Sequence, residues 1–320
     1  MQNEFLDMKK KVFVALSTFA QYGSEPLDML TSENVEYTIN NLGRRLVKEE
    51  LIQMASGCHG IIAGVEPYDK DVLDALTELE CISRCGVGID NIDYETARAK
   101  GIVIRNTPDV VIQPVAELTI AMIFCLLRRL IFHTVSLRSG KWHKSAGGLL
   151  YGKKVGILGL GRIGKRVASI LNSIGCEVIA SDICPDVFWA KEHNVRIVSI
   201  EELLRESDIL SIHLSYTGGN RFVLGRKQIA LMKEGCVIIN TSRGCFLDEN
   251  AIYEALKEGK LGGAGLDVFL DEPYRGPLCE LDNVVLTPHI ATLTRESRLN
   301  MEIEATISLL ESLGINIMHT

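Results

Sequence analysis

The stretch that decides the fold is Lys154-Val155-Gly156-Ile157-Leu158-Gly159-Leu160-Gly161-Arg162-Ile163-Gly164. It begins as an apolar strand, and apolar residues at helical spacing follow from Ile163 to Ile170. A GxGxxG sequence on a strand-to-helix turn is typical of a dinucleotide site. Gly159 permits the tight turn, Gly161 lets the backbone approach a pyrophosphate, and Gly164 lets the helix pack against the strand. We therefore expect Gly159, Gly161, Arg162, Ile163 and Gly164 to bind a dinucleotide, with its phosphates at the helix N-terminus.

An acidic residue stands at the end of the next predicted strand, Glu177 to Asp182. Asp182 comes eighteen positions after Gly164, where a carboxylate can bind ribose hydroxyls. The residues that follow are Ile183-Cys184-Pro185, so no adjacent arginine is available for a 2′-phosphate. Because a carboxylate repels such a phosphate, the expected cofactor is NAD.

Outward from this motif, short β-branched runs alternate with helical patterns, as in parallel strands joined by crossover helices. One strand series ends before the apolar helix Leu118 to Leu127, and a second begins after the linker Ser139 to Gly152. The predicted strands are Lys11–Leu16, Val35–Ile39, Gly60–Gly64, Cys81–Cys85, Ile102–Arg105, Lys154–Leu160, Glu177–Asp182, Val195–Val198, Ile209–Leu214, Cys236–Thr241, Gly265–Val268 and Val284–Leu286.

These series predict an α/β protein with two doubly wound parallel sheets. A Rossmann NAD-binding domain at 108–291 is expected to be inserted in a flavodoxin-like substrate domain formed by 1–107 and 292–320. The final amphipathic helix, Arg295 to Leu313, has no strand after it. We expect that helix to return to the first sheet.

Composition excludes several classes of protein. A net charge of −7 and a pI of about 5.6 give no broad attraction for nucleic acids. Nine scattered cysteines without a CxxC pair favour a reducing, cytoplasmic compartment, and no metal site is expected. The chain start lacks the apolar core of a signal peptide, and the Leu118–Leu127 helix is too short for a bilayer, so no membrane partner is expected.

Two side chains that follow late strands have the chemistry to act on a small acid. Arg243 comes after the strand Cys236–Thr241, and its planar guanidinium suits a bidentate grip on a carboxylate. His289, in Thr287-Pro288-His289, could exchange a proton with a carbonyl oxygen. Taken alone, such an arginine is more often a surface charge and such a histidine is usually structural.

An acid beside the histidine would raise its pKa and keep it protonated near neutral pH. Asp267, Asp271 and Glu272 all follow the strand Gly265–Val268. Spacing alone does not choose among them.

Several motifs, in the same order, resemble the D-isomer-specific 2-hydroxyacid dehydrogenases. The resemblance spans nearly the whole chain. The matching segments are Arg84-Cys85-Gly86-Val87-Gly88-Ile89-Asp90-Asn91-Ile92-Asp93, Asn106-Thr107-Pro108, Val115-Ala116-Glu117-Leu118, Gly156 to Gly164, Asn240-Thr241-Ser242-Arg243-Gly244, Gly265 to Phe269 with Glu272-Pro273, and Thr287-Pro288-His289.

The resemblance implies a role for each matched residue. Arg243 would bind the substrate carboxylate and carbonyl, Glu272 would pair with the histidine, and His289 would be the acid/base. The backbone N–H groups of Val87 and Gly88 would bind the carboxylate. Asp267 would hold the nicotinamide carboxamide. The further cofactor contacts that it implies are Thr119, Leu214, Thr217 and Thr241.

Within the family, the likeness is greatest to D-3-phosphoglycerate dehydrogenases, through Arg84 and Gly140-Lys141-Trp142. A chain of 320 residues leaves no room for their C-terminal regulatory domain. One departure concerns the substrate: Gly64 stands where those enzymes typically have a phosphate-binding arginine. Arg84, or an arginine from a partner subunit, would compensate, or the substrate lacks phosphate. Glyoxylate or hydroxypyruvate reduction is the alternative.

Other proteins of the same family suggest two further functions to weigh against that of a hydroxyacid dehydrogenase. NAD(H)-sensing corepressors share the scaffold, and turnover of 2-oxo acids would distinguish an enzyme from such a binding protein. Formate dehydrogenases are disfavoured because the resemblance implies a glutamine in that branch at the position of Glu272. The family implies a homodimer, and the apolar helix Leu118 to Leu127 is the surface expected to need a partner.

Overall fold

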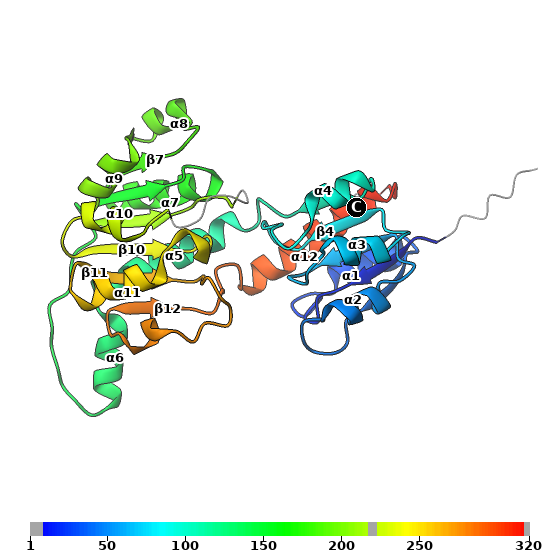
Figure 1. The fold of residues 1–320 in the computed structure, drawn as a ribbon, viewed down its shortest axis with the longest axis horizontal. Helices are drawn as coiled ribbons and strands as arrows, with labels where there is room; N and C mark the ends of the chain where they lie inside the picture. The colour runs from blue at the N-terminus through cyan, green and yellow to red at the C-terminus, as the bar shows by residue number, and fades with distance from the viewer. Residues whose placement is uncertain (1–8, 217–222, 317–320) are drawn as a thin grey trace, which may run out of the picture. The chain divides into compact units, whose positions relative to one another are not determined.

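The computed structural model describes residues 9–216 and 223–316. The chain divides into two compact units, Met1–Val111 with Leu293–Thr320 (unit 1) and Ile112–Thr292 (unit 2) (Figure 1). Each unit is a parallel sheet covered by helices, so the predicted fold class is confirmed. Among the described helices, none combines the length and the apolar character needed to span a bilayer.

Unit 1 contains a five-stranded parallel sheet with the order β2-β1-β3-β4-β5. This is the order of flavodoxin-like sheets, with a switch point between β1 and β3. Its strands are β1 (Lys11–Val14), β2 (Glu36–Ile39), β3 (Gly60–Ala63), β4 (Cys81–Arg84) and β5 (Val103–Asn106). Its helices are α1 (Glu25–Ser32), α2 (Lys48–Met54), α3 (Lys70–Ala75), α4 (Tyr94–Ala99) and α12 (Arg295–Ser312).

Helix α12 returns to this sheet, as expected from the absence of a following strand. It packs against β3, β4 and β5. The Ser83 hydroxyl donates a buried hydrogen bond of 2.7 Å to the Ala305 carbonyl. A Cβ at Gly60 would lie 2.9 Å from the Leu309 side chain, so the glycine lets α12 approach β3 closely.

Unit 2 contains a seven-stranded parallel sheet with the order β12-β11-β10-β9-β6-β7-β8. This is the Rossmann order, with its switch point between β6 and β9 and a seventh strand at the edge. Its strands are β6 (Lys154–Leu158), β7 (Glu177–Ser181), β8 (Val195–Ile197), β9 (Ile209–Ile212), β10 (Cys236–Asn240), β11 (Leu261–Leu266) and β12 (Val284–Leu286). Its α-helices are α5 (Ile112–Leu127), α6 (Leu130–Arg138), α7 (Arg162–Ile174), α8 (Val187–Glu192), α9 (Ile200–Glu206), α10 (Arg226–Leu231) and α11 (Glu249–Lys257), and two 3₁₀ turns are η1 (Gly244–Phe246) and η2 (Pro277–Glu280).

Strand β11 begins four residues earlier than its sequence predicts. It starts at Leu261 and ends at Leu266, whereas the pattern indicated Gly265 to Val268. Glycines have low strand propensity, which hid the first half of the strand. A Cβ at Gly262 would lie 2.4 Å from the Gly235 carbonyl oxygen, so a close backbone approach requires glycine there.

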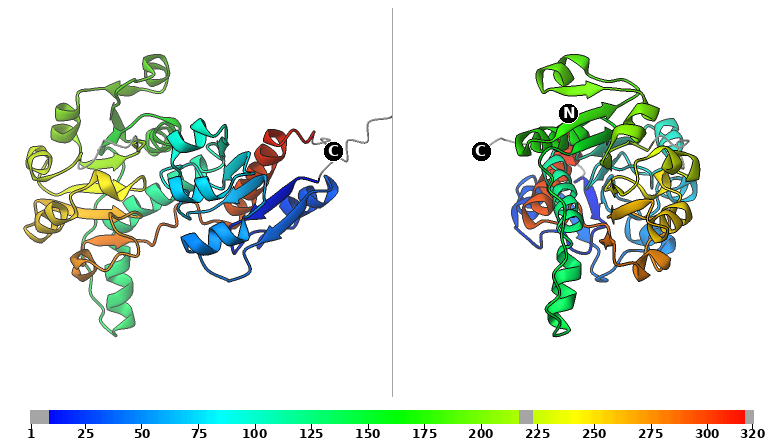
Figure 2. Two further views of the ribbon diagram at one scale, coloured as in Figure 1. Left: turned by 45° about the vertical axis from the view of Figure 1, so that its right-hand side comes forward. Right: turned by 90° about the vertical axis from the view of Figure 1, so that its left-hand side faces the viewer.

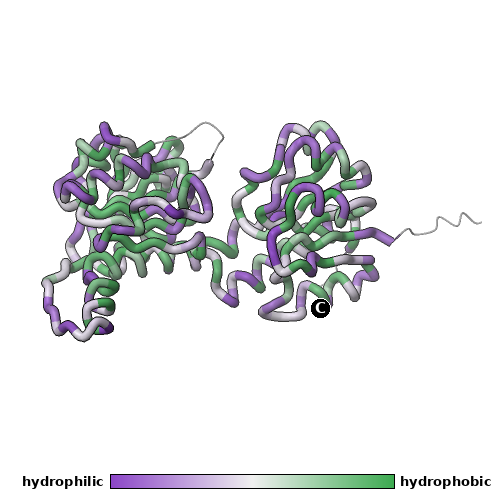
Figure 3. Tube along the Cα trace, turned by 60° about the horizontal axis from the view of Figure 1, so that its bottom comes forward, coloured by the Kyte–Doolittle hydropathy of each residue, from purple (hydrophilic) through white to green (hydrophobic). Residues whose placement is uncertain are grey.

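The apolar surface of unit 2 differs from the expected one. Helix α5, which contains the predicted apolar stretch Leu118 to Leu127, packs against α7, β10 and β11. Within that stretch Phe124 remains exposed, and further exposed apolar side chains lie on α6, which extends away from the sheet of its unit (Figure 2), and in the segment after it. Those of α6 and the segment after it are Leu130, Ile131, Val135, Leu137, Trp142, Leu149 and Tyr151. Figure 3 shows hydrophobic segments inside both units and again on α6.

Candidate active site

The glycine turn between β6 and α7 has the geometry of a cradle for a pyrophosphate. Gly159 has φ +95°, and a Cβ there would lie 2.6 Å from the His213 carbonyl oxygen. A Cβ at Gly164 would lie 2.1 Å from the Gly159 carbonyl oxygen, so helix and strand touch at this point. By contrast, a Cβ at Gly161 would meet no atom within 4 Å. Gly161 caps α7, and space therefore remains for a phosphate at the helix N-terminus.

Asp182, which follows β7, is hydrogen-bonded to this turn. Its carboxylate accepts hydrogen bonds from the backbone N–H of Leu160 at 2.6 Å and of Cys184 at 2.8 Å. The side chain is half-buried, while Arg162 and Ile163 form the first turn of α7. The structure thus places the acid beside the glycine turn, and its contact with ribose stays a prediction.

Two of the predicted cofactor-contacting residues meet in the core. The Thr119 hydroxyl donates to the Val115 carbonyl at 2.8 Å, so the Thr241 hydroxyl donates to Thr119 across 3.0 Å. Leu214 follows β9, and its backbone N would lie 3.1 Å from a Cβ at Gly159. Thr217, also predicted as a cofactor contact, lies outside the described residues.

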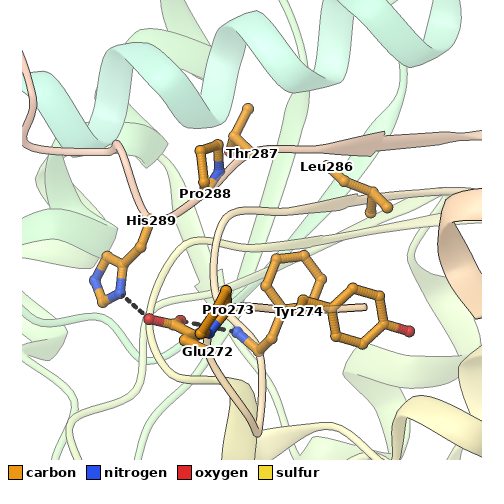
Figure 4. A pocket seen from close by; sticks show the side chains of 8 residues that line it. Glu272, Pro273, Tyr274, Leu286, Thr287, Pro288 and His289 are labelled. Atoms are coloured by element: carbon orange, nitrogen blue, oxygen red, sulfur yellow. Dashed lines mark hydrogen bonds and ion pairs between the residues drawn. The ribbon is translucent and has the colours of Figure 1, made fainter. Parts of the chain in front are cut away.

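His289 and Glu272 form a hydrogen-bonded pair beside a cavity of about 350 Å³ (Figure 4). Glu272 Oε2 lies 2.9 Å from His289 Nδ1, and Oε1 accepts a 3.1 Å hydrogen bond from the backbone N–H of Phe269. The side chains of His289 and Glu272 are 49% and 39% exposed. The cavity lining also includes the stacked rings of Phe269 and Tyr274. Of the acids at 267, 271 and 272, the structure pairs Glu272 with the histidine.

The surroundings of Glu272 favour its charged form. Burial by itself raises the pKa of the carboxyl group. The hydrogen bond from His289, the charge of that ring, the Phe269 N–H and the charge of Arg243 together outweigh burial and leave the pKa below its usual value. Glu272 is therefore an ionised acceptor at neutral pH.

Arg243 lies on the loop after β10. The side chain of Asn240 holds this loop through hydrogen bonds. The Asn240 amide donates to the Arg243 carbonyl at 2.8 Å, and its Oδ1 accepts from the N–H and the hydroxyl of Ser242. A Cβ at Gly244 would lie 1.9 Å from the Phe269 carbonyl carbon, so this loop abuts the segment that leads to Glu272. The structure brings Arg243, Glu272 and His289 to the same edge of the sheet.

Asp267 has a structural role that its spacing did not reveal. It is fully buried, and its backbone carbonyl accepts from the His289 N–H at 2.9 Å. Its carboxylate accepts from Thr287 Oγ1 at 2.6 Å and from the N–H groups of Ile290 at 2.7 Å and Ala291 at 2.9 Å. His289 has φ +55°, a conformation that a non-glycine residue keeps only when its surroundings hold it. Asp267 supplies that support. Its contact with a carboxamide stays a prediction.

The predicted substrate-binding residues of unit 1 gather after β4. Arg84 is the last residue of that strand, and its Nη1 donates to the Cys85 carbonyl. The Asn106 amide donates to the Val87 carbonyl at 2.8 Å, which fixes the loop that contains Gly88. Gly64 directly follows β3, the neighbouring strand in the sheet.

The sequence model of the "D-isomer specific 2-hydroxyacid dehydrogenase, NAD binding domain" matches residues 120–291, over half of the chain. The chain belongs to the D-isomer-specific 2-hydroxyacid dehydrogenases. This family consists of NAD-dependent oxidoreductases that act on the CH–OH group of 2-hydroxy acids. The matched segment contains the glycine turn and the Arg243, Glu272 and His289 group.

Named relatives within the family differ in substrate. A hydroxypyruvate reductase of Thermotoga maritima is 36% identical over 94% of this chain and 100% of its own length. A D-3-phosphoglycerate dehydrogenase of Methanocaldococcus jannaschii is 40% identical over 79% of this chain, but the match spans only 49% of that relative. The chain thus spans about half the length of such dehydrogenases.

Solved structures of the family agree with the fold of this chain. The TT0316 protein of Thermus thermophilus superimposes with a TM-score of 0.88 at 34% identity, over 95% of this chain and 97% of its own. A glyoxylate reductase of Paecilomyes thermophila gives a TM-score of 0.86 at 29% identity, over 97% and 98% of the two chains. The two-sheet architecture is therefore that of this dehydrogenase family.

Proposed function

We propose that this chain is an NAD-dependent D-2-hydroxyacid dehydrogenase that interconverts a small 2-hydroxy acid and its 2-oxo acid. The observation that carries the proposal is the His289–Glu272 pair at 2.9 Å, on the same sheet edge as Arg243. When bound, NAD(H) accepts or supplies the hydride at C2 of the substrate. The space at Gly161 supports the binding of that cofactor by unit 2.

In this proposal His289 moves the proton. Glu272 holds Nδ1, which leaves Nε2 as the nitrogen that gives a proton to the carbonyl oxygen during reduction and takes it back during oxidation. The carboxylate of Glu272 fixes the ring orientation through its contact with Nδ1. A fixed ring lowers the barrier for a proton transfer that accompanies hydride movement.

The other side chains bind and orient. Arg243 would hold the substrate carboxylate and polarise its carbonyl, since a guanidinium matches both oxygens in one plane. The N–H groups of Val87 and Gly88 and the Arg84 side chain would bind the substrate from unit 1. Asp182 would bind the adenosine ribose. A carboxylate has about four lone-pair sites, so Asp267 could accept a carboxamide N–H in addition to its three donors.

The test is NADH oxidation with a panel of 3-phosphohydroxypyruvate, hydroxypyruvate, glyoxylate and pyruvate. We expect turnover with at least one of them, and a loss of about 10²–10⁴-fold in His289→Ala while NADH still binds. NADH binding without turnover of any acid would instead favour an NAD(H)-sensing corepressor. Unchanged turnover in His289→Ala would remove the histidine from the mechanism.

We also propose that two copies of the chain pair through α6. The supporting observation is that its apolar side chains Leu130, Ile131, Val135 and Leu137 are exposed, as is Trp142 after the helix at 81%. Monomeric proteins seldom expose large apolar patches. Light scattering after size exclusion should give a dimer, and Val135→Glu should shift it to monomer. A monomeric wild type would refute the pairing.

We further propose a cytoplasmic location. The nine cysteines, all among the described residues, form no disulfide bond, and five of them are buried. Free thiols in this number suit a reducing compartment. Fractionation of cells that express the chain would test the location, and recovery in an oxidising compartment would contradict it.

A further inference from the structure

A buried acid lies at the edge of unit 1 where the substrate is proposed to bind. Glu66 comes three residues after the end of β3 and is only 3% exposed. Its Oε2 is buried and has no hydrogen-bond partner among the described residues. The Asn91 amide donates to the carbonyls of Gly64 at 3.2 Å and of Glu66 at 2.6 Å, so the loop itself is well held. The carboxylate is thus kept inward at a cost in solvation.

Gly64 makes room for this carboxylate. A Cβ at position 64 would lie 2.7 Å from Glu66 Oε2, closer than a side chain can approach. Any larger residue at 64 would therefore displace the carboxylate. The acid occupies the space in which a side chain of residue 64 would begin.

Two arginine charges act on the acid. Burial raises the pKa of Glu66, and the backbone N–H groups of Glu66 and Gly64 together with the charges of Arg45 and Arg84 oppose that rise. Arg84 ends β4, and Arg45 lies in the loop after β2. The three charged groups therefore belong to the carboxyl-terminal edge of the sheet, where ligands of doubly wound sheets bind. With Glu66 present this group has a net charge of +1, and without it +2.

We propose that Glu66 is a specificity-determining residue, which sets the charge at this edge so that the enzyme accepts a 2-oxo acid with an uncharged C3 group and disfavours a phosphorylated one. This inference rests on the proposed dehydrogenase function. A phosphate monoester brings about −1.5 to −2 charges at pH 7. A carboxylate at the same edge of the sheet repels this charge, and we expect the repulsion, after screening, to weaken binding by a factor of about ten or more. An uncharged hydroxyl group experiences no such repulsion, and its O–H can donate to a carboxylate.

The experiment compares kcat/KM for 3-phosphohydroxypyruvate with kcat/KM for hydroxypyruvate, at low ionic strength. The wild type should favour hydroxypyruvate. Glu66→Gln, which keeps the shape and removes the charge, should raise the phosphorylated-to-unphosphorylated ratio about tenfold or more. Glu66→Asp keeps the charge and should stay within about threefold of wild type. The matched control is Glu78→Gln, because Glu78 is exposed at the opposite edge, before β4 begins, and its ratio should not change.

A second variant keeps the inference testable if Glu66→Gln does not fold. Gly64→Arg displaces the carboxylate and adds a cation, and it should raise the same ratio by at least as much. A wild type that prefers the phosphorylated acid, or a folded Glu66→Gln or Gly64→Arg with the wild-type ratio, would overturn the role of Glu66. Absence of turnover with every acid would instead overturn the proposed function, and this inference with it.

Discussion

The glycine turn allows one methyl group to be tested at two positions only three residues apart. Gly161→Ala and Gly164→Ala add the same atom to the same turn, yet the structure predicts opposite outcomes. At Gly161 the new Cβ would meet no atom within 4 Å, and the backbone has φ −73°, which alanine adopts readily. At Gly164 it would lie 2.1 Å from the Gly159 carbonyl oxygen.

The magnitudes follow from these two environments. For Gly161→Ala, a gain of about 0.4–1 kcal/mol from reduced unfolded-state entropy opposes a comparable loss of N-cap preference, so stability should change by less than about 1 kcal/mol. For Gly164→Ala, the helix propensity gain of about 1 kcal/mol is smaller than the cost of separating α7 from β6, about 1–3 kcal/mol or more. Gly164→Ala should therefore destabilise unit 2, although glycine-to-alanine changes inside helices usually stabilise.

The assay measures thermal unfolding and the NADH dissociation constant of both variants. Gly161→Ala should keep the melting temperature of the wild type and bind NADH at least tenfold more weakly, because the methyl group fills the space meant for the pyrophosphate. Gly164→Ala should lower the melting temperature by several degrees. Wild-type NADH affinity in Gly161→Ala would refute the placement of the phosphates at this helix end. Wild-type stability in Gly164→Ala would refute the packing argument.

Three further predictions concern the residues around the site. Asp267→Asn should lower kcat by about tenfold or more. The new amide group would place a donor against the buried N–H of Ala291, at a cost of about 1–3 kcal/mol. An unchanged kcat would show that the turn at His289 does not depend on this carboxylate. Arg243→Lys should lower kcat/KM for the 2-oxo acid by about tenfold or more while NADH affinity stays the same, since an ammonium cannot grip both carboxylate oxygens, and equal kinetics would exclude that grip. Burial lowers the pKa of His213 from 6.5 to about 4, so the unfolded chain binds a proton that the folded chain does not, and stability should fall as pH drops from about 6.5 towards 4. Melting temperatures at pH 7 and pH 5 should therefore differ less in His213→Gln than in wild type, and an equal loss would contradict the assignment.

Sequence patterns predicted the elements better than the interactions between them. Strand alternation and the glycine turn were sufficient for two parallel sheets, because period and turn chemistry are local properties. The early start of β11 was missed because position 262 requires glycine for a close contact with Gly235, a residue of the neighbouring loop. Local propensity contains no information about such a contact.

The site residues were likewise predictable by position but not by contact. Spacing alone does not tell whether Asp267, Asp271 or Glu272 pairs with the histidine. Only the folded loop places Glu272 against His289 and Asp267 against the backbone of the turn that follows it. Glu66 could not be singled out from the sequence, because it is one acid in a loop and belongs to no motif. Its proposed role depends on the space that Gly64 leaves for its carboxylate, which only the folded structure shows.

The return of α12 to β3, β4 and β5 has a consequence for synthesis on the ribosome. Unit 2 is one continuous segment, Ile112–Thr292, and can complete its core while translation continues. Unit 1 has all five of its strands earlier but lacks the Ala305 and Leu309 contacts that cover them until α12 has been made. The part of the chain that emerges first is therefore the last to finish folding, and its uncovered strands are the stage at which a chaperone would be needed.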